Sequence, residues 1–169
     1  ASPQLAQGNT RSFDISTLGS ILTDKELMPA IKGLMIWCAN PVVTQINANR
    51  VRAGLKRDDL FTVVLEHFMT DTARYADIVL PSTTQLEHFD RVLPWGHHYI
   101  TANNPAIEPL GESKSHGDIM RLLAPRLGLF GPVCGEDDET IASSALPANV
   151  SMDDLKTIGW HKISPARPG

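Results

Sequence analysis

Three polar side chains of this sequence follow apolar segments and have the chemistry to bind a nucleotide. Asn40 carries a hydrogen-bond donor and an acceptor on one side chain. Glu66 has a carboxylate that can accept two parallel hydrogen bonds, which suits the adjacent N1–H and N2–H donors of a guanine. Thr70 supplies a hydroxyl group. Pro41 and Thr70 also stand at the expected starts of two helices, where free backbone N–H groups attract phosphate.

The same residues have a purely structural interpretation. Asn and Thr are common in turns and at helix caps, and a Glu at the end of a strand is often simply solvated. Spacing alone therefore leaves both interpretations open for Asn40, Glu66 and Thr70.

Other reactive side chains carry weaker signals. His97 and His98 are adjacent, and neighbours on a strand point to opposite faces, so this pair is a poor metal chelate. Cys38 ends an apolar run, which predicts a core thiol. The sequence contains no GxSxG, GxGxxG or GxxxxGK[ST] motif. We therefore assign no catalytic residue and no metal ligand to this chain.

The elements that would position these residues alternate between strand and helix. Apolar runs over 34–38 and 60–65 predict buried strands, and apolar residues at four-residue spacing over 43–57 predict an amphipathic helix. A short helix over 71–76 and a third strand over 77–80 follow. Short strand–helix–strand units are parallel and right-handed by default. The pattern indicates an α/β fold, a Rossmann-like doubly wound sheet that is mostly parallel, with helices on both faces.

Such a sheet gathers the loops after its strands. Ligands of open parallel sheets bind beyond the carboxyl ends of the strands. We expect the loops 38–42, 66–72 and 81–87 to share one edge, although they lie far apart in the sequence.

The rest of the chain is less regular. We expect a lead-in and a short helix over 1–29, an α/β core over 30–130 and a helical or irregular extension over 131–169, all in one domain. A short strand is predicted near 99–101 and a helix over 115–127, which Pro125 should kink or end early. Further helices are predicted up to Leu146 and after Ser151, the last closed by Gly159.

Composition excludes several classes of protein. The 169 residues are 42% hydrophobic and 20% charged with a net charge of −4, which is ordinary for a globular protein and argues against a nucleic-acid partner. No apolar stretch is long enough to cross a bilayer, and the amino terminus has no signal-peptide pattern. Two cysteines are too few for a disulfide framework. We expect a cytoplasmic location without membrane insertion.

One stretch matches a longer pattern. Residues 60–81 resemble the signature of molybdopterin oxidoreductases of the dimethyl sulfoxide reductase family: a strand, an acidic residue, F-x-T-x-T-A and A-D-[IV]-V-L-P. This chain has FMTDTA at 68–73 and ADIVLP at 76–81. The flanking segments also resemble the family. Residues 39–41 resemble its turn after the first strand. Residues 105–114 resemble its P-A-I-x-P-x-G-E-x-[KR] segment, and residues 122–128 resemble its L-A-x-x-L-G ending. The resemblance covers roughly residues 30 to 130.

The resemblance implies a cofactor-binding domain. Members include formate dehydrogenases and reductases, in which two molybdopterin guanine dinucleotides (the bis form) ligate one molybdenum. By resemblance, the turn of Ala39, Asn40 and Pro41 belongs to the cofactor site, Glu66 meets the guanine and Thr70 lies beside the phosphates.

The resemblance also implies a larger parent enzyme. The family's amino-terminal cysteine cluster and a recognisable molybdenum ligand are absent from this sequence. We therefore expect a fragment of a catalytic subunit, inactive alone. The implied partners are the remaining domains of the parent chain and an electron-transfer subunit, and an iron–sulfur cluster would lie elsewhere in the parent. The alternatives are a stand-alone, non-catalytic nucleotide-binding or subunit-interaction module with the same fold, or an inert scaffold domain.

Overall fold

The computed structural model describes residues 11–93, 95–131 and 134–163. The chain divides after Leu80 into two compact units, each with its own core. The domain limits expected at 29/30 and 130/131 stay a prediction.

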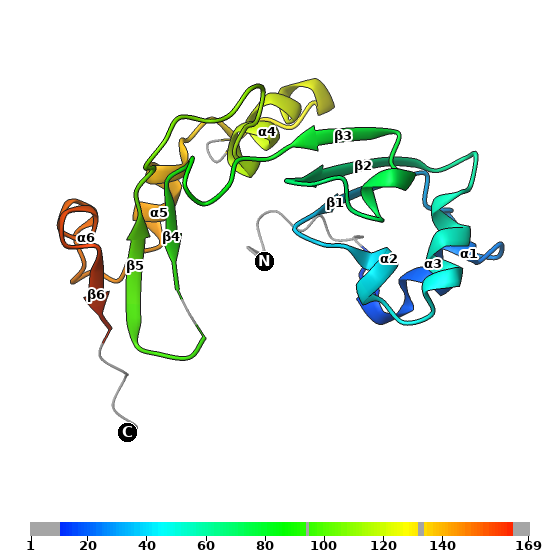
Figure 1. Cartoon of the computed structure of the whole chain (residues 1–169), viewed down its shortest axis with the longest axis horizontal. Coiled ribbons are helices and arrows are strands. Elements are labelled where there is room, and N and C mark those ends of the chain that lie inside the picture. Colours follow the sequence, from blue (N-terminus) through cyan, green and yellow to red (C-terminus); the bar gives the residue numbers. More distant parts are fainter. Residues whose placement is uncertain (1–10, 94, 132–133, 164–169) are drawn as a thin grey trace. The chain divides into compact units, whose positions relative to one another are not determined.

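The first unit contains a three-stranded parallel sheet (Figure 1). Its strands are β1 (Gly33–Trp37), β2 (Phe61–Glu66) and β3 (Ile78–Pro81), in the order β1-β2-β3. β1 pairs parallel with β2, with Met35 opposite Val63. The α/β class expected from the alternating elements is confirmed.

The helices of this unit are shorter than the periodicity indicates. They are η1 (Ile15–Thr17), α1 (Leu18–Thr23), α2 (Pro41–Thr44), α3 (Ala48–Leu55) and the 3₁₀ turn η2 (Ala73–Tyr75). The single helix expected over 43–57 is divided because Gln45 is extended, which ends α2, and Asn47 adopts a left-handed conformation with φ of 57° before α3. Its side chain then caps α3 by accepting a hydrogen bond from the Arg50 N–H.

The core of the first unit lies between α1, α3 and the sheet. Leu22 of α1 and Val51 of α3 are fully buried and pack with Ile36 of β1 and Val64 of β2. The two helices approach closely because Gly54 of α3 has no side chain: a Cβ there would overlap the Cβ of Leu22.

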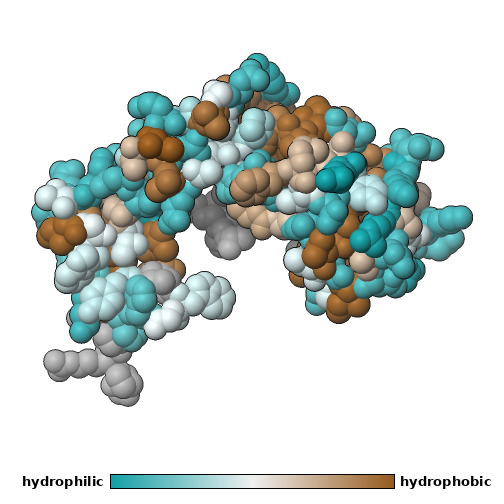
Figure 2. Space-filling model, in the orientation of Figure 1, coloured by the Kyte–Doolittle hydropathy of each residue, from teal (hydrophilic) through white to brown (hydrophobic). Residues whose placement is uncertain are grey.

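β1 is an edge strand of the sheet. Of its five residues only Ile36 is buried, so the apolar run is not covered on both faces as the sequence suggested. The side chain of Trp37 is 53% exposed. Cys38, which follows, is exposed and has φ of 54°, so the prediction of a core thiol is wrong. Brown, hydrophobic surface is visible on the first unit among the hydrophilic areas (Figure 2).

The second unit is built on an antiparallel sheet. Its strands are β4 (Asp90–Val92), β5 (Tyr99–Asn103) and β6 (Trp160–Lys162), and the sequence indicated β5 alone. Ile100 of β5 is fully buried against Met152 and Leu155 of α6 (Met152–Ile158).

Further helices within the described residues are α4 (His116–Leu123), η3 (Pro125–Leu127) and α5 (Asp138–Ser144). Pro125 ends α4 early, as expected, and Gly128 and Gly159 adopt left-handed conformations with φ of 72° and 88° after η3 and α6. Among the described helices, none combines the length and apolarity that a membrane span requires.

Candidate functional site

The carboxyl ends of β1 and β2 place two of the predicted loops at one edge. The parallel register sets Trp37 opposite Leu65, so the loops 38–42 and 66–72 leave the sheet side by side. We call these two loops the carboxyl edge. The third predicted loop, 81–87, falls in the second unit.

Hydrogen bonds join the two loops of the carboxyl edge directly. The Thr72 hydroxyl donates to Asn40 Oδ1 at 2.7 Å, and the Thr72 backbone N–H donates to the same oxygen at 3.2 Å. The Val42 N–H donates to Thr72 Oγ1 at 3.1 Å. Thr72 is fully buried and Asn40 half-buried. The Asn40 turn is therefore fixed by the loop that follows β2.

These contacts overturn one expectation about phosphate. Free N–H groups were expected at the start of the helix after Pro41, but Pro41 has no N–H and the Val42 N–H is bonded to Thr72. The N–H groups of Val43 and Thr44 both donate to the Asn40 carbonyl oxygen, at 3.0 Å each. The start of α2 therefore offers no free backbone donor for an anion.

Glu66 and Thr70 lie on the loop after β2. Glu66 is half-buried, and its Oε1 accepts a hydrogen bond from the His67 N–H at 2.8 Å. Its Oε2 has no hydrogen-bond partner among the described residues. Thr70 is half-buried, and its Oγ1 accepts a hydrogen bond at 3.2 Å from the N–H of Ala73, the first residue of η2.

The remaining predicted residues border a cavity. Ala39 is exposed and Pro41 is buried as the first residue of α2. Both line an apolar cavity of about 240 Å³ beside β1, together with Leu34, Trp37 and others.

Sequence reasoning missed Thr72. Thr72 is the second threonine of the FMTDTA segment, so the family motif already marked this position. Its role depends on a hydrogen bond to a residue 32 positions earlier, which spacing does not show.

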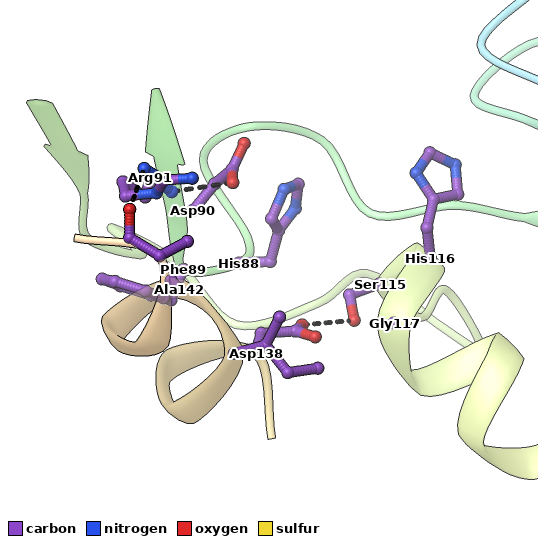
Figure 3. Close-up of a pocket in the computed structure, with 11 residues that line it drawn as sticks. His88, Phe89, Asp90, Arg91, Ser115, His116, Gly117, Asp138 and Ala142 are labelled. Carbon is purple, nitrogen blue, oxygen red and sulfur yellow. Dashed lines mark hydrogen bonds between the residues drawn. The ribbon is translucent and has the colours of Figure 1, made fainter. Parts of the chain in front are cut away.

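The second unit contains another pocket, of about 320 Å³, between β4, α4 and α5 (Figure 3). Its acidic side chain Asp138 accepts hydrogen bonds from the Ser115 hydroxyl at 2.9 Å and from Arg121 at 2.9 Å. His88 Nδ1 lies 2.9 Å from the Thr83 hydroxyl. These contacts join elements of the unit. No group of three His, Cys, Asp or Glu side chains suited to a metal occurs in the described parts of the chain.

Comparison with known proteins gives consistent matches. The model of the family "Molybdopterin oxidoreductase" matches residues 13–126. The chain is 40% identical to Probable oxidoreductase YoaE of Bacillus subtilis over 98% of its own length and 25% of that protein. It is 36% identical to the assimilatory nitrate reductase catalytic subunit of the same organism, over 58% of this chain and 14% of that protein.

A solved structure shares the fold. The chain superposes on acetylene hydratase from Pelobacter acetylenicus with a TM-score of 0.73 and 24% identity, over 89% of this chain and 21% of that chain. The chain thus spans a quarter or less of the length of these relatives.

Proposed function

Because this chain belongs to the molybdopterin oxidoreductase family, whose members use a molybdopterin cofactor with molybdenum, we propose that its carboxyl edge holds the guanosine end of a molybdopterin guanine dinucleotide. In the parent enzyme this would be one of the two dinucleotides of the bis form. The observation that carries the proposal is the direct bonding of the Asn40 turn to the loop after β2, at the edge where open parallel sheets bind ligands.

The donor and acceptor groups of this edge are suited to a guanine nucleotide. Asn40 Nδ2 and Glu66 Oε2 have no hydrogen-bond partner among the described residues, so one donor group and one acceptor remain for a ligand. The free Oε2 of Glu66, together with the second lone pair of Oε1 beside its bond to the His67 N–H, matches the N1–H and N2–H groups of guanine, and an amide N–H matches a phosphate or carbonyl oxygen.

Each residue then has a stated role. Glu66 accepts from the guanine edge, Asn40 donates, and the Thr70 hydroxyl lies beside the phosphates, with Ala39 and Pro41 shaping the turn. The molybdenum and its pterin supply the redox chemistry when bound, and the residues of this chain bind and orient the nucleotide end.

The activity of the whole protein extends beyond this chain. Since the chain spans only 25% of YoaE, a formate dehydrogenase-like or reductase activity is a proposal for the parent. The molybdenum ligand would come from its remaining domains. An iron–sulfur cluster, an electron-transfer subunit and a cytoplasmic location stay predictions from the sequence.

Calorimetric titration of the chain with GDP and with ADP tests the proposal. Adenine lacks both donors that Glu66 would bind, so we expect GDP to bind at least ~10-fold more tightly, the equivalent of about 1.4 kcal/mol. Equal affinity for the two nucleotides, or no binding of GDP, would contradict a guanine site at this edge.

A further inference from the structure

We propose that Thr72 is a positioning residue that turns the Asn40 side chain so that its NH₂ group, and not its carbonyl oxygen, is presented to the ligand. The position would then select a hydrogen-bond acceptor, such as a phosphate or a purine carbonyl oxygen. The identity of that ligand rests on the proposed function, whereas the orientation of Asn40 does not.

The orientation follows first from the backbone of Thr72. The two ends of an Asn amide are distinguished by their partners, and a backbone N–H can only donate. The Thr72 N–H points at the Asn40 side chain at 3.2 Å, so the Asn40 atom that it meets must be the oxygen.

The hydroxyl of Thr72 gives a second, independent reason. The Val42 N–H donates to Thr72 Oγ1 at 3.1 Å and thereby uses the oxygen as an acceptor. Oγ1 keeps a second lone pair, but Thr72 is fully buried, and among the described residues its hydroxyl hydrogen has Asn40 Oδ1, 2.7 Å away, as its acceptor. An Asn40 NH₂ group at that place would leave this buried hydrogen without an acceptor, so the satisfied arrangement again places the Asn40 oxygen there. Because Thr72 is fully buried, water does not compete for these bonds.

The consequence concerns the other end of the amide. Asn40 Oδ1 accepts two hydrogen bonds, and Nδ2 has no partner among the described residues. The backbone N–H groups that begin α2 are engaged or missing, so the side chain of Asn40 supplies the donor at this turn.

Three variants of the chain test the inference. Thr72→Val removes the hydroxyl at nearly constant shape, Thr72→Ser restores it, and Asn40→Asp keeps the accepting end while replacing the outward NH₂ by oxygen. The measurements are the ¹³Cγ chemical shift of Asn40 in the free protein, GDP affinity by calorimetry, and the midpoint of thermal unfolding as a check on folding.

We expect Thr72→Val to shift the Asn40 ¹³Cγ signal and weaken GDP binding ~5-fold, as for one lost hydrogen bond. Thr72→Ser should retain the signal and bind GDP within ~2-fold of wild type. Asn40→Asp should weaken GDP binding more than ~10-fold, because an acceptor then faces an acceptor.

The outcomes separate this inference from the proposed function. An unchanged ¹³Cγ signal in folded Thr72→Val would overturn the positioning role, and wild-type GDP affinity in Asn40→Asp would overturn the donor role. If wild type binds no GDP but the ¹³Cγ signal moves in Thr72→Val and returns in Thr72→Ser, the orientation stands and the guanine proposal fails.

Discussion

Glu66 is the residue on which guanine recognition depends in the proposed site. It is the last residue of β2, and its position is set by the sheet, since Leu65 before it is almost fully buried. One carboxylate oxygen is bonded to the next backbone N–H, which limits rotation of the side chain. A carboxylate held in this way offers its other oxygen in a defined direction.

Replacing this carboxylate should weaken nucleotide binding specifically. Glu66→Ala is expected to weaken GDP binding by about 1–3 kcal/mol, the usual loss for a hydrogen bond to a charged group, and to leave the weaker ADP binding nearly unchanged. Calorimetry of both nucleotides provides the measurement. Glu26→Ala is the matched control, because Glu26 is an exposed glutamate on the loop before β1. A similar loss of GDP affinity in both variants would point to net charge instead of contact.

Asp59 makes a testable contribution to stability at low pH. Hydrogen bonds from Arg57 at 2.9 Å and from Lys32 at 2.6 Å lower the pKa of its carboxyl group well below the ordinary value. The unfolded chain binds the proton more readily than the folded one. The stabilisation is therefore present above the unfolded pKa of about 4 and is lost as the pH falls through the lower folded pKa.

We expect wild type to be more stable than Asp59→Asn at neutral pH, with the difference shrinking steadily below about pH 4. Urea unfolding from pH 3 to pH 7 measures it. Asp58→Asn is the neighbouring control, because Asp58 is exposed and forms none of the ion pairs of the described residues. A difference independent of pH would show that the ion pairs do not contribute.

At the scale of elements, the close crossing of α1 and α3 holds the first unit together. A Cβ at Gly19 of α1 would lie 2.9 Å from the Val51 backbone nitrogen, and Gly54 of α3 faces Leu22. The two glycines allow the helices to approach, and the buried Leu22 and Val51 side chains fill the space beside them.

Gly54→Ala should therefore destabilise the protein although alanine is the better helix former. Overpacking against Leu22 costs about 1–3 kcal/mol, which exceeds the gain of about 1 kcal/mol in helix propensity. Chemical denaturation gives the value. Gly33→Ala should change stability by less than ~0.5 kcal/mol, because no atom lies within 4 Å of a Cβ at Gly33. A stabilised Gly54→Ala would show that the helices can separate without cost.

Some of the strands and helices could be predicted from the sequence alone, and others could not. The parallel unit of β1 and β2 could be predicted, because apolar runs and short connections determine it. The division of the helix at Asn47 could not, since a left-handed residue leaves no trace in hydrophobic spacing. β4 and β6 have three residues each and form by pairing with β5. At the site, topology predicts the shared edge of Asn40 and Glu66, but the bond between Asn40 and Thr72 requires coordinates.

At the scale of the whole chain, the buried apolar side chains form two separate core clusters, one in each unit. Leu22 lies in the core of the first unit and Leu155 in that of the second, and both side chains are almost fully buried. A substitution in one core should therefore lower mainly the stability of the unit that contains it.

Leu22→Ala and Leu155→Ala should each cost about 2–5 kcal/mol, as for other buried leucines. Hydrogen exchange followed by mass spectrometry should show lost protection mainly in residues 11–80 for the first variant and in 81–163 for the second. Equal loss of protection across both units in either variant would mean that they unfold as one.

Exposed apolar side chains near the carboxyl edge should promote self-association of the chain. Phe68 is 76% and Met69 61% exposed. Sedimentation velocity should show association that rises with concentration and that decreases in Phe68→Ser. Leu110→Ser, at a position 82% exposed in the second unit, is the control. A monomeric profile at all concentrations would contradict this expectation.

The bond between Asn40 and Thr72 also has a kinetic consequence. It joins the two loops in the free chain, so the proposed nucleotide site would be preorganised and would lose little chain entropy on association. Stopped-flow traces with GDP should then be single exponentials whose observed rate rises linearly with nucleotide concentration, without the plateau of a slow rearrangement step.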